Sequence, residues 1–205
     1  MTLSTYLRPA AILALALSLA ACGGKASFPI NGTVSGLTYG GLVITTNGMD
    51  LAIPANATAF SFPNSLSYGD VYDITVKSPA AHEDCTTIDP LTGRNTGADT
   101  AGRFTTIAVT LTCVIQQHSI GGAVSGLTTD GLVLTNGSAG GTVPIAANAT
   151  SYAFAALVPY NVSYGVTVYT QPKDAVCTVA NTSGVMGDVN ITNIDVSCKS
   201  TLTTP

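Results

Sequence analysis

One seven-residue motif occurs twice in the chain. It reads Asn31-Gly-Thr-Val-Ser-Gly-Leu37 and returns 90 residues later as Gly121-Gly-Ala-Val-Ser-Gly-Leu127. Further pairs follow in the same order: Gly41-Leu-Val-Ile-Thr45 with Gly131-Leu-Val-Leu-Thr135, Tyr68 with Tyr160, Tyr72 with Tyr164, Cys85 with Cys177, and Cys113 with Cys198. Motifs that recur in a fixed order over such a length indicate one structural unit duplicated in tandem.

Within each copy, apolar residues alternate with polar or small ones. The closing segments Ile107-Ala-Val-Thr-Leu-Thr-Cys113 and Ile194-Asp-Val-Ser-Cys198 have this pattern. A period of two is typical of strands with one buried face, and no segment after residue 21 has a sustained helical period. Asn47-Gly48 and Asn136-Gly137 lie between apolar runs and predict two tight hairpins. The sequence therefore predicts an all-β chain of two tandem antiparallel β-sandwiches, with an immunoglobulin-like or transthyretin-like topology.

Five cysteines are present, and one of them, Cys22, lies apart from the repeats. The other four allow three pairings, and the repeat selects Cys85–Cys113 and Cys177–Cys198, one bridge within each copy. Closing loops of this length stabilises each copy by roughly 3–4 kcal/mol, and such bridges persist in oxidising compartments. A zinc site is the alternative, but two isolated thiols per copy lack the paired spacing of zinc ligands.

The first 21 residues have the organisation of a signal peptide. Arg8 precedes an apolar run over residues 10–19, which is shorter than the roughly 20 residues that a transmembrane helix needs. Leu19-Ala-Ala-Cys22 follows and resembles the lipobox of bacterial lipoproteins. This resemblance implies cleavage after Ala21, a diacylglyceryl thioether on Cys22, and N-acylation with a fatty acid such as palmitate. Gly23 after the cysteine favours the outer membrane.

These signals divide the chain into six parts. We expect a helical signal peptide over residues 1–21, a short tether over 22–29, a first sandwich over 30–114, a linker over 115–118, a second sandwich over 119–199 and a C-terminal tail over 200–205. The tether from Cys22 to Phe28 extends roughly 25 Å at most. The first sandwich is therefore expected close to the lipid surface.

Charge is sparse along the whole chain. Charged residues make up 9%, with seven Lys and Arg against eleven Asp and Glu and a formal net charge of −4. A nucleic-acid partner requires clustered Lys and Arg that displace counterions from phosphate. The basic residues here are scattered, so the composition excludes nucleic acid as a partner.

Candidate ligand-facing residues lie in loops. The cluster His82-Glu83-Asp84 could bind a metal ion or act as acid and base, but we interpret it as a solvated loop. The loop 89–99 spaces oxygen side chains among glycines, as calcium ligands require, yet it lacks the EF-hand spacing. Tyr39 and Tyr169 are candidates for exposure, where a ring could stack on a sugar. The ligand-facing residues that we name are Tyr68, Tyr160, Asp89 and Asp99. We predict no catalytic residue, no metal and no cofactor.

The repeat as a whole resembles modules found in tandem in proteobacterial surface lipoproteins. The shared features are Val34-Ser-Gly-Leu37, Gly41-Leu-Val43, a Tyr-x-Ile/Val-x-Val strand and two cysteines that bracket the last hairpin. The resemblance implies an immunoglobulin-like sandwich, an envelope location and no settled activity.

We therefore predict a non-enzymatic cell-envelope protein, held in the outer membrane by Cys22 and either periplasmic or surface-exposed. Its modules act as spacer or interaction domains for an envelope protein or a glycan. The alternatives are a carbohydrate- or calcium-dependent binding module and, third, a hydrolase or metalloenzyme.

Overall fold

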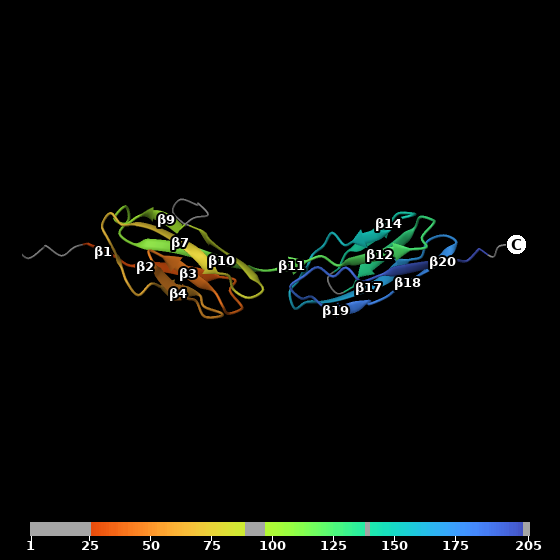
Figure 1. The fold of residues 1–205 in the computed structure, drawn as a ribbon, viewed down its shortest axis with the longest axis horizontal. Helices are drawn as coiled ribbons and strands as arrows, with labels where there is room; N and C mark the ends of the chain where they lie inside the picture. The colour runs from red at the N-terminus through yellow and green to blue at the C-terminus, as the bar shows by residue number, and fades with distance from the viewer. Residues whose placement is uncertain (1–25, 89–96, 138–139, 203–205) are drawn as a thin grey trace, which may run out of the picture.

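The computed structural model describes residues 26–88, 97–137 and 140–202, all of them in strands, turns or loops. The predicted signal peptide, Cys22 and Asp89 lie outside these residues. Within the described ranges, no helix has the length and apolarity to cross a bilayer. Strands β1–β10 form one unit, module 1, and β11–β20 form a second, module 2, and the two lie end to end (Figure 1).

The strands of module 1 are β1 (Ser27–Phe28), β2 (Ile30–Ser35), β3 (Val43–Thr46), β4 (Met49–Ala52), β5 (Ala59–Ser61), β6 (Leu66–Ser67), β7 (Val71–Ser78), β8 (Glu83–Ile88), β9 (Gly97–Thr100) and β10 (Ile107–Ile115). Those of module 2 are β11 (Gln117–His118), β12 (Gly121–Ser125), β13 (Leu132–Asn136), β14 (Thr142–Ile145), β15 (Ser151–Ala153), β16 (Val158–Pro159), β17 (Ser163–Thr170), β18 (Ala175–Val179), β19 (Ser183–Val185) and β20 (Val196–Ser200).

Each module is a sandwich of two four-stranded sheets with a two-stranded ribbon at one end. The sheet orders are β5-β2-β10-β8 and β4-β3-β7-β9 in module 1, and β15-β12-β20-β18 and β14-β13-β17-β19 in module 2. Buried residues of both sheets, such as Ile30, Ile44, Ile74 and Leu111, pack into one core cluster. Module 2 has its own equivalent cluster. The prediction of two all-β sandwiches is confirmed.

One strand pair in each module is parallel, whereas we expected only antiparallel pairs. Strand β10 pairs with β2 from Ile107↔Ile30 onwards, and β20 pairs with β12 from Val196↔Val124. In each module the closing strand, β10 or β20, runs in the same direction as the first long strand, β2 or β12. In addition, β2 and β3 lie in different sheets, while the first two strands of an immunoglobulin constant domain share a sheet. The strand order therefore differs from that of an immunoglobulin constant domain.

The two Asn-Gly motifs have different outcomes. Asn47 and Gly48 have φ of 48° and 75° and connect Thr46 to Met49 as a two-residue hairpin turn, as predicted. Asn136 instead belongs to β13, and the connection to β14 is longer. The reason is an insertion: this hairpin is the place where the distance between equivalent residues grows from 90 to 92.

The segments that we expected to be a tether and a linker contain short paired strands. Strand β1 lies within 22–29 and pairs with β6, and β11 lies within 115–118 and pairs with β16. The chain therefore enters each module along a ribbon, which fixes its direction at that end.

A disulfide joins the last two neighbouring strands of one sheet in each module. Cys85–Cys113 links β8 to β10 and Cys177–Cys198 links β18 to β20, in the pairing that the repeat predicts. The glycine of the Val-Ser-Gly-Leu motif lies against this strand pair. Gly36 has φ of 78°, and a Cβ there would lie 2.1 Å from the carbonyl oxygen of Cys113. This position thus excludes side chains both by its backbone conformation and by its neighbour.

We predict that Gly36→Ala destabilises the protein more than Gly48→Ala does. Gly48 has nearly the same φ, 75°, but nothing lies within 4 Å of its missing Cβ. Gly48→Ala should cost only the left-handed backbone strain, about 1–2 kcal/mol. Gly36→Ala adds a steric clash, and overpacking of this kind lowers stability by about a further 1–3 kcal/mol. Urea unfolding of the two variants measures the difference in stability. Equal losses of unfolding free energy would show that the contact between Gly36 and the Cys113 carbonyl does not matter.

Candidate functional site

The strongest constellation of polar and aromatic side chains lies where the two modules meet. The His82 ring stacks on the Tyr160 ring, with centroids 3.7 Å apart and planes 6° apart. Tyr39 meets both rings edge-on, at 5.2 Å from His82 and 5.6 Å from Tyr160. The imidazole is also engaged at its edge, where Nδ1 of His82 lies 2.5 Å from Oδ1 of Asp188. We call these four residues the junction cluster.

The linker is bonded to both modules at the same place. The Gln116 backbone N–H donates to the His82 carbonyl at 2.9 Å, and the Tyr160 N–H donates to the Gln116 carbonyl at 2.8 Å. The Gln116 side-chain amide also donates to Asp84 Oδ1 at 2.9 Å. Because linker and rings are held together, rotation of one module against the other would break several contacts at once.

His82 reaches Tyr160 from a turn that the repeat preserves, although its side chain is not preserved. His82 and its counterpart Asp174 both have φ of 60°, a left-handed conformation that His and Asp tolerate better than most residues. Tyr39 corresponds to Thr129. The stacking residues are therefore specific to the end of module 1 that faces module 2.

Glu83, next to His82, is fully buried. Its two carboxylate oxygens accept the backbone N–H groups of Thr38 and Tyr39, at 2.9 and 3.2 Å. Burying a carboxylate is costly unless it is hydrogen-bonded, and charge-assisted bonds to N–H groups are the strong kind. Glu83 thus holds the loop that presents Tyr39 to the junction. Our interpretation of 82–84 as a solvated loop is wrong for Glu83, because its carboxylate is buried and accepts the backbone N–H groups of Thr38 and Tyr39.

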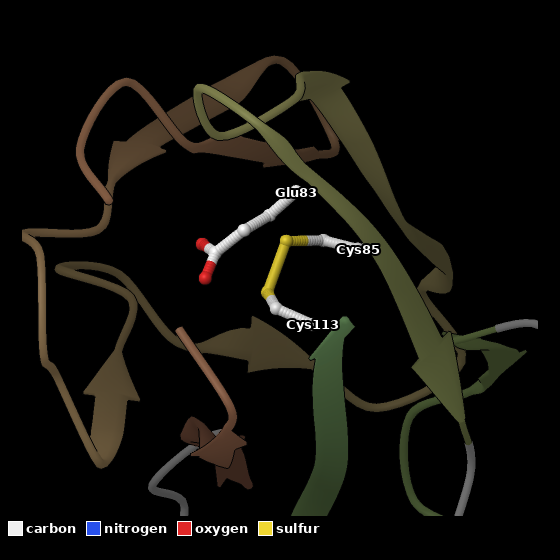
Figure 2. Close-up of side chains that lie close together, drawn as sticks. All are labelled: Glu83, Cys85 and Cys113. Atoms are coloured by element: carbon white, nitrogen blue, oxygen red, sulfur yellow. A yellow bond between two sulfur atoms is a disulfide. The ribbon is translucent and has the colours of Figure 1, made fainter. Parts of the chain in front are cut away.

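Glu83 also lies beside the disulfide of module 1 (Figure 2). One donor atom each of Glu83, Cys85 and Cys113 lies within 4.8 Å of the others, which is close enough for a metal site. In this structure the two sulfurs are bonded to each other and the carboxylate is bonded to two N–H groups. The three side chains therefore act as one structural unit.

The ligand-facing residues of the sequence analysis do not form one site. Tyr160 is half-buried in the junction cluster, whereas Tyr68 is 76% exposed at the far end of module 1. The Asp99 carboxylate accepts the Thr100 N–H at 2.8 Å and pairs with Arg103 at 3.5 Å. Asp89 and most of the loop 89–99 lie outside the described residues.

Two shallow grooves, of about 290 and 240 Å³, lie along the first long strand of each module, between β2 and β10 in module 1 and beside β12 and β15 in module 2. None of the residues that line them is charged. In module 2 the Tyr152 hydroxyl donates to the Ile194 carbonyl at 2.8 Å. Burial, with the negative charge of Asp195 adding to it, raises the pKa of Tyr152 to about 12. Tyr152 is thus a fixed hydrogen-bond donor, and the grooves offer no acid–base pair.

Tyr39, His82 and Tyr160 were each singled out from the sequence, but their meeting in the junction cluster was not predicted. The available signal was the asymmetry between the copies, because module 1 has Tyr39, His82 and Glu83 where module 2 has Thr129, Asp174 and Ala175. That difference marks the position but does not reveal that Tyr160 lies opposite.

No family model matches the chain, and no curated protein matches it either. Among solved structures, the chain is similar to the Bacillus anthracis TIE protein, at 13% identity and a TM-score of 0.49, over 85% of this chain and 34% of that one. It is also similar to the shaft pilin SpaA of Lactobacillus rhamnosus GG (8% identity, TM-score 0.30, 86% and 100% covered). A third similar structure is the pilus adhesin SpaC of the same organism, at 10% identity and a TM-score of 0.31, over 85% of this chain and 30% of that one. The chain spans about a third of the TIE chain. At these identities and scores, the similarities concern chain architecture and carry no argument about function.

We predict that His82→Ala or Tyr160→Ala uncouples the modules without unfolding them. The lost stacking contributes about 0.5–1.5 kcal/mol beyond the buried area. In the unmodified protein, ¹⁵N relaxation should give one correlation time for both modules, and in the variants each module should tumble faster. Tyr169→Ala is the matched control, because it removes the same type of side chain from a position in module 2 that is 71% exposed. Unchanged relaxation in the junction variants would contradict the coupling.

We further predict that Glu83→Gln lowers the free energy of unfolding by about 1–3 kcal/mol. An amide has one acceptor oxygen, so its NH₂ group would face one of the two backbone N–H donors. Asp73→Asn, an exposed carboxylate on β7, is the control, with an expected change within about 0.5 kcal/mol. Denaturant unfolding compares the two variants. If Glu83→Gln left the free energy of unfolding unchanged, the carboxylate charge would not be required.

Proposed function

We propose that the chain is a lipid-anchored, non-catalytic spacer of the cell envelope, whose two modules hold an interaction surface away from the membrane. The junction cluster carries this proposal. It stacks His82 on Tyr160, and the adjoining Gln116 is bonded to both modules, so that the sandwiches are coupled end to end. A free linker would be enough if the modules only had to be tethered.

Dimensions support a spacer. A compact unit of this size is roughly 30 Å across, and two units in line reach on the order of 60 Å. Each module also has its own core and its own disulfide. A bridge of this kind stabilises each module by constraining its unfolded state, and it persists in an oxidising compartment.

The anchor follows from the lipobox at Leu19-Ala-Ala-Cys22. Because more than one acyl chain is needed for stable membrane binding, the thioether and the N-acyl group together would hold the chain firmly. The sorting signal at Gly23 favours the outer membrane as its location.

A binding module for glycans or calcium is less well supported. Tyr160 packs within the junction cluster, and Asp99 is engaged by Thr100 and Arg103. The exposed rings of Tyr68 and Tyr169 lie on different modules, so these two do not form one sugar platform. Hydrolase chemistry through His82 would require the imidazole to leave its stack on Tyr160.

We predict that the mature protein begins at Cys22 and carries acyl chains there, whereas Cys22→Ala leaves residues 1–21 in place and unacylated. Without the thioether, the lipoprotein-type cleavage after Ala21 has no substrate. Intact mass spectrometry of membrane-extracted protein distinguishes the two forms. Replacing Cys85 and Cys113 together is the control and should not change the N-terminus. An unmodified or uncleaved start in the unaltered protein would refute the anchor.

A further inference from the structure

Module 1 has a second end, opposite the junction, where exposed apolar side chains gather. Tyr68 is 76%, Val71 is 72% and Phe104 is 38% exposed. Phe28 is half-buried, with its ring 6.5 Å from that of Tyr68, and the Arg103 guanidinium lies 5.5 Å from the Phe104 ring centroid. We call these five residues the basal surface.

Three chain segments bring the basal surface together. Strand β1 pairs with β6 just before Tyr68, which places Phe28 beside this loop. The Gly69 N–H donates to the Ala101 carbonyl and the Ala101 N–H to the Asp70 carbonyl, at 2.9 and 2.8 Å. The Tyr68 ring lies so close to Gly102 that a Cβ there would be 2.3 Å from it. Tyr68 is therefore exposed but fixed in position.

The equivalent end of module 2 shows what this kind of surface does in the same chain. There Tyr160 and Asp188 receive His82 of module 1. By the repeat, Tyr160 corresponds to Tyr68 and Asp188 to Arg103. This end of the sandwich is thus a docking end in module 2, and no part of the described chain docks on it in module 1.

The uncovered end is the more apolar of the two. Module 1 has Phe28, Val71 and Phe104 at the positions where module 2 has His118, Ser163 and Val189. If the uncovered end of module 1 met only water, it would be expected to be the more polar of the two ends. Exposed apolar patches on a soluble protein instead mark interaction sites. The basal surface therefore needs an occupant.

We propose that the basal surface rests on the lipid headgroup layer; this inference depends on the anchor of the proposed function. Ser27 follows Cys22 by five residues, a span of at most about 18 Å. An acylated Cys22 would keep this end of module 1 within reach of the membrane. The Tyr68 ring matches the interfacial zone, because its body is apolar and its hydroxyl is polar. Phe28 and Phe104 add apolar contact with the acyl boundary. Arg103 can keep its charge in the headgroups while its stem lies along the Phe104 ring.

Apolar contact rather than charge drives this docking. Arg103 pairs with Asp99, and the Asp70 carboxylate accepts the Ser67 N–H at 2.8 Å, so both signs are present. The surface does not resemble the basic clusters that select anionic lipids. We therefore expect docking to depend little on salt and on anionic lipid content.

Single tryptophans test this geometry, because the chain contains no tryptophan. Tyr68→Trp places a reporter on the basal surface, and Tyr169→Trp places a matched reporter, also highly exposed, on module 2. The acylated protein is reconstituted into phosphatidylethanolamine–phosphatidylglycerol vesicles with and without brominated phosphatidylcholine. We expect bromine quenching to be several-fold stronger for the Tyr68→Trp variant than for the Tyr169→Trp variant. Phe104→Trp is a second basal reporter with the same expected result.

The outcomes separate docking from anchoring. Flotation of the proteins with vesicles reports the anchor alone. If both variants float but the basal reporter and the module 2 reporter are quenched equally, the docking inference is wrong and the anchor stands. If neither floats, the anchor fails and the docking inference falls with it. If the basal reporter is shielded only as protein concentration rises, without lipid quenching, a second copy occupies the basal surface and the lipid inference is overturned.

Discussion

The pairing of β8 with β10 holds both the core of module 1 and the residues that meet module 2. The Cys85–Cys113 bridge joins the two strands in register. Glu83 lies at the beginning of β8, His82 just before it, and Gln116 just after β10. A slip of one residue would turn Glu83 outward and His82 away from module 2, because side chains alternate between the faces of a strand. The disulfide thus supports the junction as well as the core.

The two modules show how a duplicated unit acquires different ends. Their sheets, disulfides and left-handed turns are equivalent, but the turn residue is His82 in one and Asp174 in the other. The buried Glu83 of module 1 is replaced by Ala175. The carboxylate lies at the end of module 1 where the loop with Tyr39 meets module 2, and Ala175 lies at the end of module 2 that faces away from module 1. The two modules therefore differ at the end through which module 1, but not module 2, contacts its neighbour.

The contacts of the junction are individually weak and mutually dependent. A stacked ring pair contributes about 1 kcal/mol, and a typical hydrogen bond contributes about as much. His82, Tyr39 and Gln116 nevertheless lie on segments that the β8–β10 pair and Glu83 already hold in place. Little conformational entropy is left to lose when module 2 docks, so a small set of contacts is enough to align two domains. The basal surface has the same preorganisation, since Gly102 and the β1–β6 ribbon fix Tyr68.

The duplication, the all-β class, the disulfide pairs and the Asn47-Gly48 turn could all be predicted from the sequence. These depend on alternation, on internal repeats and on short-range backbone preferences, all of which are visible along the chain. The sequence did not reveal the parallel β2–β10 pair, the longer second hairpin, the burial of Glu83 or the stack of His82 on Tyr160. These features depend on how the folded strands and modules pack, because most of them join residues far apart in sequence. His82 and Asp188, for example, are separated by 106 positions and meet only once two folded modules are placed end to end.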